Sequence, residues 1–230
     1  TGIQHGTVTV LLAGEPIEVT TFRGEGAYSD GRRPDSVEFV TDLERDLERR
    51  DFTVNAIALD PTRGAIVDPL GGRGDLSAKL IRAVGDPRER FDEDGLRPLR
   101  ALRFAAVLGF EIDEATLAAI PATRERFRMV SAERVRVELL KLLAAPTPSR
   151  GVELLRRSEL LEEILPELVP TIGLTQNAHH MDDVWHHTLK VLDGVPARGM
   201  LRLAALLHDV GKPPTVAPRD DDPTHNSFHD

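Results

Sequence analysis

Cysteine is absent from the 230 residues of this chain. Without a thiol the chain can form no disulfide, and it offers no thiolate to a metal ion. A bound metal would therefore need histidine and carboxylate ligands. That donor set favours magnesium or another hard divalent cation.

Long apolar runs are absent too, because none approaches the roughly 20 residues that a membrane-spanning helix needs. The first residues, Thr1 to His5, show no basic, apolar or small-residue export pattern. We therefore expect a cytoplasmic protein without membrane association.

Positive charge is in short supply. The chain has 29 Lys and Arg against 38 Asp and Glu, which gives a net charge of −9. This balance argues against a protein that coats nucleic acid non-specifically, because phosphate contacts come from Lys and Arg. The arginines nevertheless gather within 82–103 and 124–136, so a local basic surface is compatible with an acidic molecule.

The first part of the chain reads as a mixture of strands and helix. With 40% hydrophobic residues and no tandem repeat, the chain can build one large domain or two modest ones. β-branched runs at 7–12 and 17–22, separated by a turn sequence, predict a β-hairpin. Before Arg82 we also expect a loop at 24–34, a helix at 42–59 that breaks around Arg49 to Thr53, and a strand at 65–67.

Beyond Arg82 the pattern becomes almost wholly helical. The predicted helices lie at 93–108, 114–120, 131–144, 150–157 and 158–165, with proline breaks at 146–148 and 166–170. The composition changes again near Gln176, because seven of the eight histidines of the chain follow it. The fold class predicted for the whole chain is α+β.

One predicted helix carries Asp94, Arg97, Arg100 and Arg103, three residues apart. This spacing places one carboxylate and three guanidinium groups on one broad face. A carboxylate accepts from an exocyclic amino group and an arginine fork donates to ring acceptors, so the pair can read the edge of a base. The same spacing fits a salt-bridged, solvated helix face. Pro98 is expected in the first helical turn, where a missing N–H costs little.

Two further groups are weaker candidates. Glu18, on the second predicted strand, can help to hold a divalent metal if other carboxylates converge on it, but an exposed strand glutamate is the ordinary alternative. Arg50, Asp51 and Asn55 lie in an unusually polar helix end. They fit either substrate binding or a helix cap with surface charges.

A histidine-rich group lies near the C-terminal end. His187 lies on one apolar segment, and His208 with Asp209 follows another. A His-Asp pair after an apolar run is costly to bury unless it binds something, and imidazoles with a carboxylate are suitable ligands for a hydrolytic metal site. A single structural His-Asp pair is the alternative.

Four ordered motifs resemble those of class II tRNA nucleotidyltransferases (CCA-adding enzymes) and bacterial poly(A) polymerases. The motifs are the segments 17–23, 46–56, 68–76 and 90–97, and the resemblance covers roughly residues 2–170. It implies a nucleotidyltransferase head with a small mixed β-sheet at 1–82, followed by a helical neck and body at 83–172.

The resemblance also implies roles for single residues. Asp94 and Arg97 would read the base, and Glu18 would match the family's third carboxylate. Gly71 and Gly72 would form a flexible coupling turn. The remaining nucleotide-binding residues implied, for sugar and phosphates, are Arg23, Arg50, Asp51, Asn55, Arg100 and Arg103.

In the family, the two aspartates that principally hold Mg²⁺ lie upstream of the position that matches residue 1. We therefore expect the chain to be a piece of a longer enzyme, to bind nucleotide poorly and to catalyse nothing by itself. The segment 173–230 is similar to an all-helical HD-type phosphohydrolase domain, in which His187, His208 and Asp209 would bind a divalent metal. That family's last aspartate ligand would lie beyond Asp230, so this part is also expected to be incomplete.

The function implied is addition of C and A, from CTP and ATP, to the 3′ end of tRNA. The 3′-hydroxyl would attack the α-phosphate with the help of two magnesium ions. A poly(A) polymerase, or an enzyme that adds only CC or only A, has the same motifs. An HD-type metal phosphohydrolase and a degenerate RNA-binding protein are alternatives of other classes. The sequence leaves the oligomeric state open.

Overall fold

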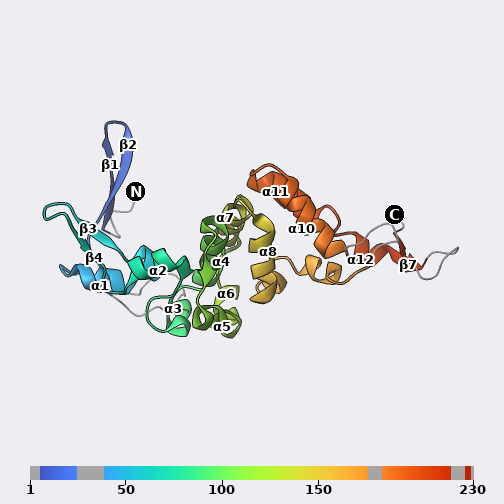
Figure 1. Ribbon diagram of the computed structural model, residues 1–230, viewed down its shortest axis with the longest axis horizontal. Coiled ribbons are helices and arrows are strands. Elements are labelled where there is room, and N and C mark those ends of the chain that lie inside the picture. The colour runs from blue at the N-terminus through green and yellow to red at the C-terminus, as the bar shows by residue number, and fades with distance from the viewer. Residues whose placement is uncertain (1–5, 25–38, 176–182, 219–225, 229–230) are drawn as a thin grey trace.

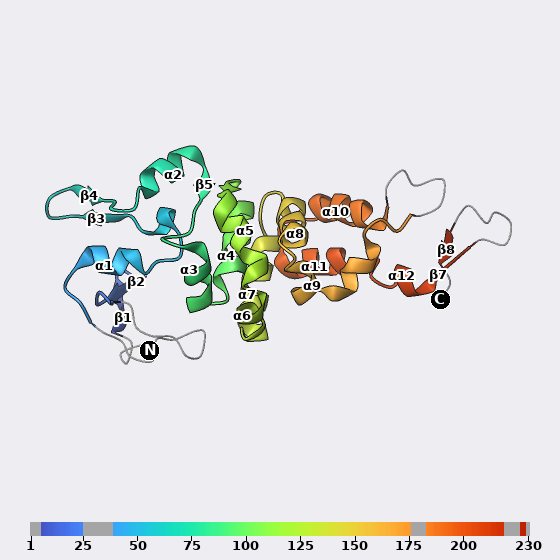
Figure 2. The same ribbon diagram turned by 90° about the horizontal axis from the view of Figure 1, so that it is seen from below.

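The computed structural model describes residues 6–24, 39–175, 183–218 and 226–228. The molecule is an elongated α+β structure, in which the first and last strands lie at opposite ends and the helices fill the middle (Figures 1 and 2). The predicted α+β class is confirmed. No helix in the described ranges has the length and apolar character needed to cross a membrane.

The part up to residue 82 begins with the predicted hairpin. Strands β1 (Thr7–Leu12) and β2 (Glu15–Thr20) pair antiparallel, and the turn residues Ala13 and Gly14 both have positive φ, as tight hairpin turns require. Figure 1 shows this hairpin standing apart from the helices. The elements that follow are α1 (Leu43–Glu48), the 3₁₀ turn η2 (Thr53–Asn55), β3 (Ala58–Asp60), β4 (Ala65–Val67), α2 (Gly72–Ala78) and β5 (Leu80–Ile81).

Gly71 and Gly72 are required by backbone geometry. Gly71 has φ of 73°, in the left-handed region that glycine tolerates best. A Cβ on Gly72 would lie 2.1 Å from the carbonyl oxygen of Thr53. The two glycines therefore let α2 pack directly against η2, so this turn holds two elements in close contact.

The central part is helical and contains most of the core. Its elements are α3 (Pro87–Glu93), α4 (Arg97–Leu108), β6 (Glu111–Ile112), α5 (Glu114–Ala122), α6 (Arg124–Arg128), α7 (Ala132–Leu143), α8 (Pro148–Arg157), α9 (Leu161–Ile164) and the 3₁₀ helix η3 (Pro166–Thr171). Helix α4 buries Leu99, Leu102 and Ala105 against α7 and α8. The short strands β5 and β6 pair in parallel.

The last part packs onto the same core. Its elements are α10 (Val184–Gly194), α11 (Gly199–Leu207), α12 (Lys212–Thr215), β7 (Val216–Pro218) and β8 (Asn226–Phe228). Trp185 of α10 and Leu206 of α11 are fully or nearly fully buried in the cluster that also contains Leu102. One apolar core thus runs from the central helices into this segment. The division at 82 and 172 stays a prediction.

The helix predicted at 93–108 is wrong in its first turn. The structure has two helices there, because Asp94 is extended (φ −140°, ψ 106°) and ends α3, while α4 begins at Arg97 with Pro98 in its first turn, as predicted. Gly95 lies in the break, where a Cβ would be 2.4 Å from the carbonyl oxygen of Arg126. Asp94 is therefore not in helical register with Arg97, Arg100 and Arg103.

Three other differences are smaller. The helix predicted at 158–165 is reduced to α9, because Glu159 has positive φ (62°) after α8. The segment 173–230 is not all-helical, since β7 and β8 form an antiparallel pair. In the described residues the strands before Arg82 form no common sheet: β1 pairs with β2, β3 pairs with β4, and β5 pairs with β6 beyond Arg82. Most of the predicted loop at 24–34 lies outside the described residues.

Candidate functional site

A polar pocket of about 460 Å³ lies where α4 meets the segment after α1. Its wall contains five arginines, two aspartates, one asparagine and two apolar side chains: Arg49, Arg50, Arg97, Arg100, Arg134, Asp51, Asp94, Asn55, Leu96 and Phe104. The excess of arginine favours an anionic ligand. The guanidinium forks suit phosphate and carbonyl acceptors.

One side of the pocket is built by the turn between α1 and η2. Asp51 is buried and accepts hydrogen bonds from the Phe52 backbone N–H and from Asn55 Nδ2, both at 2.9 Å. Phe52 is fully buried, so the polar residues on either side of it are anchored by the core. These contacts fix Asp51 and Asn55 before any ligand arrives.

The other side is built by α4 and the break before it. Arg97 donates to the backbone carbonyls of Arg90 (2.8 Å) and Arg49 (3.1 Å), and it forms an ion pair with Glu93. Arg100 donates to Asp51 at 2.8 Å. These two arginines connect α4 to the turn after α1, which preorganises the pocket across two distant parts of the sequence.

Asp94 is held by a residue that the sequence did not single out. Its carboxylate accepts a hydrogen bond from the Leu96 N–H at 3.0 Å, and Arg134 of α7 donates to both of its oxygens at 3.1 and 2.8 Å. The Asp94 and Arg134 side chains are each about one-fifth exposed. The carboxylate is thus reachable from the pocket and fixed in direction.

A buried carboxylate lies beneath this site. Asp46, 2% exposed, accepts from Arg49 Nε (3.0 Å), Arg50 (2.8 Å) and the Arg23 N–H (3.0 Å). Burial by itself would raise the pKa of Asp46, but the hydrogen bonds from Arg49, Arg23 and Arg50 together lower it below its ordinary value. Asp46 therefore anchors the arginine pair at the pocket edge.

The structure brings six of the predicted nucleotide-binding residues to this pocket: Arg50, Asp51, Asn55, Asp94, Arg97 and Arg100. The other two predicted nucleotide-binding residues, and the predicted metal-binding carboxylate Glu18, do not line it. Glu18 is exposed on β2, Arg23 contacts α1 through its backbone, and Arg103 pairs with Glu138. Arg134, Arg49, Leu96 and Phe104 were missed. For Arg134 the sole sequence signal was the arginine cluster at 124–136.

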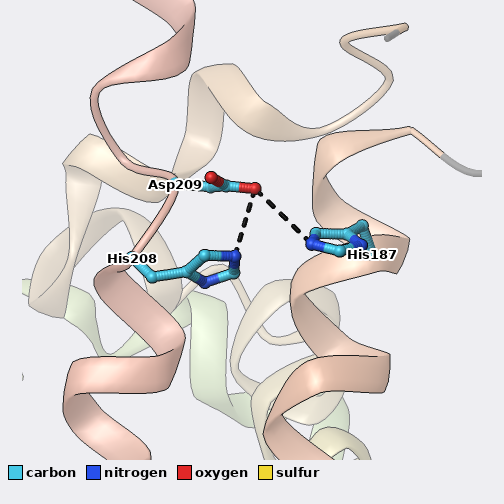
Figure 3. Close-up of side chains that lie close together, drawn as sticks. All are labelled: His187, His208 and Asp209. Carbon is cyan, nitrogen blue, oxygen red and sulfur yellow. Dashed lines mark ion pairs between the residues drawn. The ribbon is translucent and has the colours of Figure 1, made fainter. Parts of the chain in front are cut away.

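The second candidate site lies between α10 and the end of α11. His187, His208 and Asp209 each offer a ligand atom, all within 4.8 Å of one another, and the structure brings all three predicted ligands together (Figure 3). Asp209 Oδ2 lies 3.2 Å from His208 Nε2 and 3.7 Å from His187 Nε2. In the described ranges no other group of three such side chains meets this criterion.

The surroundings of the triad favour cation binding. His208 Nδ1 lies 2.7 Å from the carbonyl oxygen of Ala205, so Nδ1 donates and Nε2 is left as the acceptor atom that faces Asp209. Lys212 donates to Asp209 Oδ2 at 2.7 Å, the oxygen that also faces both histidines, so a metal ion would have to displace this ammonium group. Asp183 caps α10 and accepts from the His186 N–H. Burial alone would raise the pKa of Asp183, but hydrogen bonds from His186 and Gly173 lower it.

Two family models match the chain. The family described as "Poly A polymerase head domain" matches residues 1–82, and "Probable RNA and SrmB- binding site of polymerase A" matches residues 109–171. Neither match includes the histidine triad.

Curated relatives agree with these matches. The CCA-adding enzyme of Pediococcus pentosaceus is 46% identical over 193 residues, which is 84% of this chain and 47% of the relative. That of Enterococcus faecalis is 54% identical over 151 residues, 66% of this chain and 37% of the relative. The chain spans about half the length, or less, of the curated relatives that it matches.

Solved structures show the same likeness. A Bacillus stearothermophilus CCA-adding enzyme in complex with CTP aligns with a TM-score of 0.70 at 38% identity, over 90% of this chain and 47% of that one. A Thermotoga maritima CCA-adding enzyme complexed with tRNA aligns with a TM-score of 0.58 at 27% identity, over 71% of this chain and 37% of that one.

Proposed function

Because this chain belongs to the family of class II CCA-adding enzymes and poly(A) polymerases, we propose that its arginine-rich pocket selects CTP and ATP for addition to the 3′ end of tRNA. The observation that supports this most is the pocket itself. A fixed carboxylate, Asp94, and a fixed guanidinium, Arg97, line one cavity with four further arginines and the Asp51–Asn55 pair.

Each part of the pocket suits one part of a nucleotide. Asp94 accepts from the exocyclic amino group that cytosine and adenine share, and Arg97 donates to the neighbouring ring acceptor. Asp51 and Asn55 bind the sugar. Arg50 and Arg100 neutralise phosphate charge. The protein holds the nucleotide in place while the tRNA 3′-hydroxyl attacks the α-phosphate and pyrophosphate departs. The cytoplasm, where tRNA and nucleotides are present, is the proposed location.

Magnesium is the cofactor proposed for this transfer, with Glu18 as its candidate ligand on this chain and Arg23 on the phosphate side. In the described residues no other carboxylate or histidine gathers with Glu18 into a metal-binding group. The residues at that position do not by themselves fit a magnesium site, so no step of the transfer is derived from them.

The transfer is tested with a chimera in which this chain replaces the matching segment of the Enterococcus faecalis enzyme. Labelled CTP and ATP are offered with tRNA that lacks its 3′ end. We expect C, C and A to be added, and an Asp94→Ala variant to lose the choice of base. Long A tails would instead support a poly(A) polymerase, and addition of C alone or A alone a partial enzyme. No transfer would contradict the proposal.

A second candidate activity is metal-dependent phosphohydrolysis at the triad of His187, His208 and Asp209. The geometry favours it, because two imidazoles and a carboxylate converge. Such a site would supply a metal-bound water as nucleophile when loaded. Hydrolysis of a 2′,3′-cyclic phosphate that survives Asp94→Ala and disappears in His208→Ala would support this candidate. No hydrolysis with any divalent metal would remove it.

A further inference from the structure

Arg103 lies on α4 one turn after Arg100, and the family resemblance implies a phosphate contact for it. Its environment differs from that of the pocket arginines. Its side chain is 12% exposed and does not line the pocket. Its Nε donates to Glu138 of α7 at 2.9 Å, and Glu138 is itself 5% exposed. A phosphate would have to displace this buried ion pair, which is costly.

The flat guanidinium of Arg103 also has a second partner. Its Cζ lies 3.5 Å from the ring centroid of Phe104, a stacked cation–π arrangement. Phe104 in turn lines the pocket, and its ring packs edge-on against the buried Phe52 at 5.8 Å. The ring is therefore fixed between the core on one side and Arg103 on another.

The same ring reaches the pocket side of α4. Arg100 Cζ lies 5.5 Å from the Phe104 centroid, while Arg100 Nε donates to Asp51 at 2.8 Å. A continuous series of contacts thus runs from Glu138 through Arg103, Phe104 and Arg100 to Asp51.

We propose that Arg103 is a positioning residue: it fixes the Phe104 ring and, through that ring, holds Arg100 on Asp51, and it does not bind the nucleotide's phosphates. This inference rests on the proposed nucleotide site. It assigns a role to Phe104 as well, since the aromatic ring transmits the constraint.

The test uses the full 230-residue chain and its affinity for CTP and for cytidine, which carries no phosphate, measured by NMR titration. Arg103→Lys keeps the charge and can keep the ion pair with Glu138, but it loses the flat stacking surface. We expect CTP binding to weaken about tenfold, since a desolvated cation–π contact is worth roughly that factor. Cytidine binding weakens as well, because Asp51, which we propose binds the sugar, is held by Arg100. Phe104→Leu should weaken CTP binding to a similar extent, and Phe104→Tyr should bind CTP nearly as tightly as the wild type.

A double variant, Arg103→Lys with Phe104→Leu, separates the two roles further. If Arg103 acts through Phe104, the double variant binds CTP no more weakly than Phe104→Leu alone. Arg88→Met, which removes an exposed arginine outside the pocket, is the matched control and retains wild-type affinity. Thermal unfolding midpoints confirm that each variant is folded.

Two results would overturn the proposal. One is Arg103→Lys binding CTP like the wild type, which would show that the stacked guanidinium is not needed. The other is a double variant that binds CTP more weakly than Phe104→Leu alone, which would show that Arg103 acts independently of the ring. Either result leaves the nucleotide site intact, provided that Asp94→Ala still removes the preference for CTP over UTP. If the unaltered chain binds neither ligand, the nucleotide site and the role of Arg103 fall together.

Discussion

At the scale of single residues, the pocket depends on charged side chains that are fixed by other charged side chains. Asp94 illustrates this, because its two carboxylate oxygens are oriented by Arg134 and by the Leu96 N–H. A base-reading group needs a fixed direction, since a carboxylate that can rotate discriminates poorly between an amino group and a carbonyl. The base selectivity that we propose therefore depends on Asp94 and Arg134 together.

Arg134→Met tests that pair. Without the Arg134 guanidinium, Asp94 loses two hydrogen bonds. We expect the affinity for CTP to fall about tenfold, since a charged hydrogen bond is worth roughly 1.5–3 kcal/mol. The preference for CTP over UTP should fall as well. Arg136→Met, on the same helix but outside this pocket, is the control. Unchanged selectivity in Arg134→Met would show that Asp94 does not need its partner.

Asp46 makes a pH-dependent contribution to stability. Its pKa in the folded chain lies below the ordinary value of 3.8, so the fold favours the charged form. The stabilisation is complete above about 3.8 and is lost as the pH falls through the lowered pKa. Asp46→Asn should cost about 2–3 kcal/mol at pH 7 and progressively less below pH 3.8. Urea unfolding at pH 7 and at a pH below 3.8 measures this difference in stability, with the exposed Glu48→Gln as control. An equal cost of Asp46→Asn at the two pH values would contradict a role for the charged carboxylate.

At the scale of elements, the break between α3 and α4 creates the site. An uninterrupted helix would carry Asp94 on a helical turn, whereas the extended backbone at Asp94 lets its carboxylate face Arg134. The break is stabilised by close packing of Gly95 against the backbone of Arg126.

Gly95→Ala should therefore damage both fold and site. The added Cβ would meet the Arg126 carbonyl oxygen at 2.4 Å, so the break must shift, at a cost of about 1–3 kcal/mol. Gly74→Ala is the matched control: Gly74 lies in α2 with open space around its Cβ, and helix propensity makes this change neutral or stabilising by up to about 1 kcal/mol. Thermal unfolding and CTP titration compare the two. Equal stability of both variants would contradict the argument.

The contact between α10 and the end of α11 is expected to bind a divalent cation. Titration with Mn²⁺ should show one site, and His187→Ala should weaken binding at least about tenfold through loss of one of three ligands. His186→Ala, on the same helix but outside the triad, should bind as the wild type does. Binding that is insensitive to His187→Ala would mean that the triad is a structural polar cluster.

At the scale of the whole molecule, the two candidate sites lie in different parts of an elongated structure. The arginine-rich pocket joins α4 to the segment after α1, and the histidine triad joins α10 to the end of α11 (Figure 1). This separation allows two activities to be tested by independent substitutions.

The sequence predicted most of this arrangement where local pattern is decisive. The β1–β2 hairpin, the position of Pro98 and the helices α5, α7 and α8 followed from periodicity and turn residues. Five of the six predicted pocket residues lie in the motifs, and Arg100 follows the last of them. Arg134 was missed because it lies 40 residues from Asp94 and meets it through packing of α7. The broken helix was missed because Leu96, at the break, has helical spacing to Leu99 and Leu102 of α4, while the backbone contact of Gly95 that keeps the break is long-range.

The central claim is that this pocket reads the base of an incoming nucleotide, and the affinities of the 230-residue chain for CTP, ATP, GTP and UTP test it most directly. CTP and ATP present an amino group to Asp94, while the O4 of uracil and the O6 of guanine would face its charge. We predict that CTP and ATP bind at least about tenfold more tightly than UTP and GTP, and that Asp94→Ala removes the difference. Equal affinity for all four nucleotides in the unaltered chain, or no binding of any, would contradict the account.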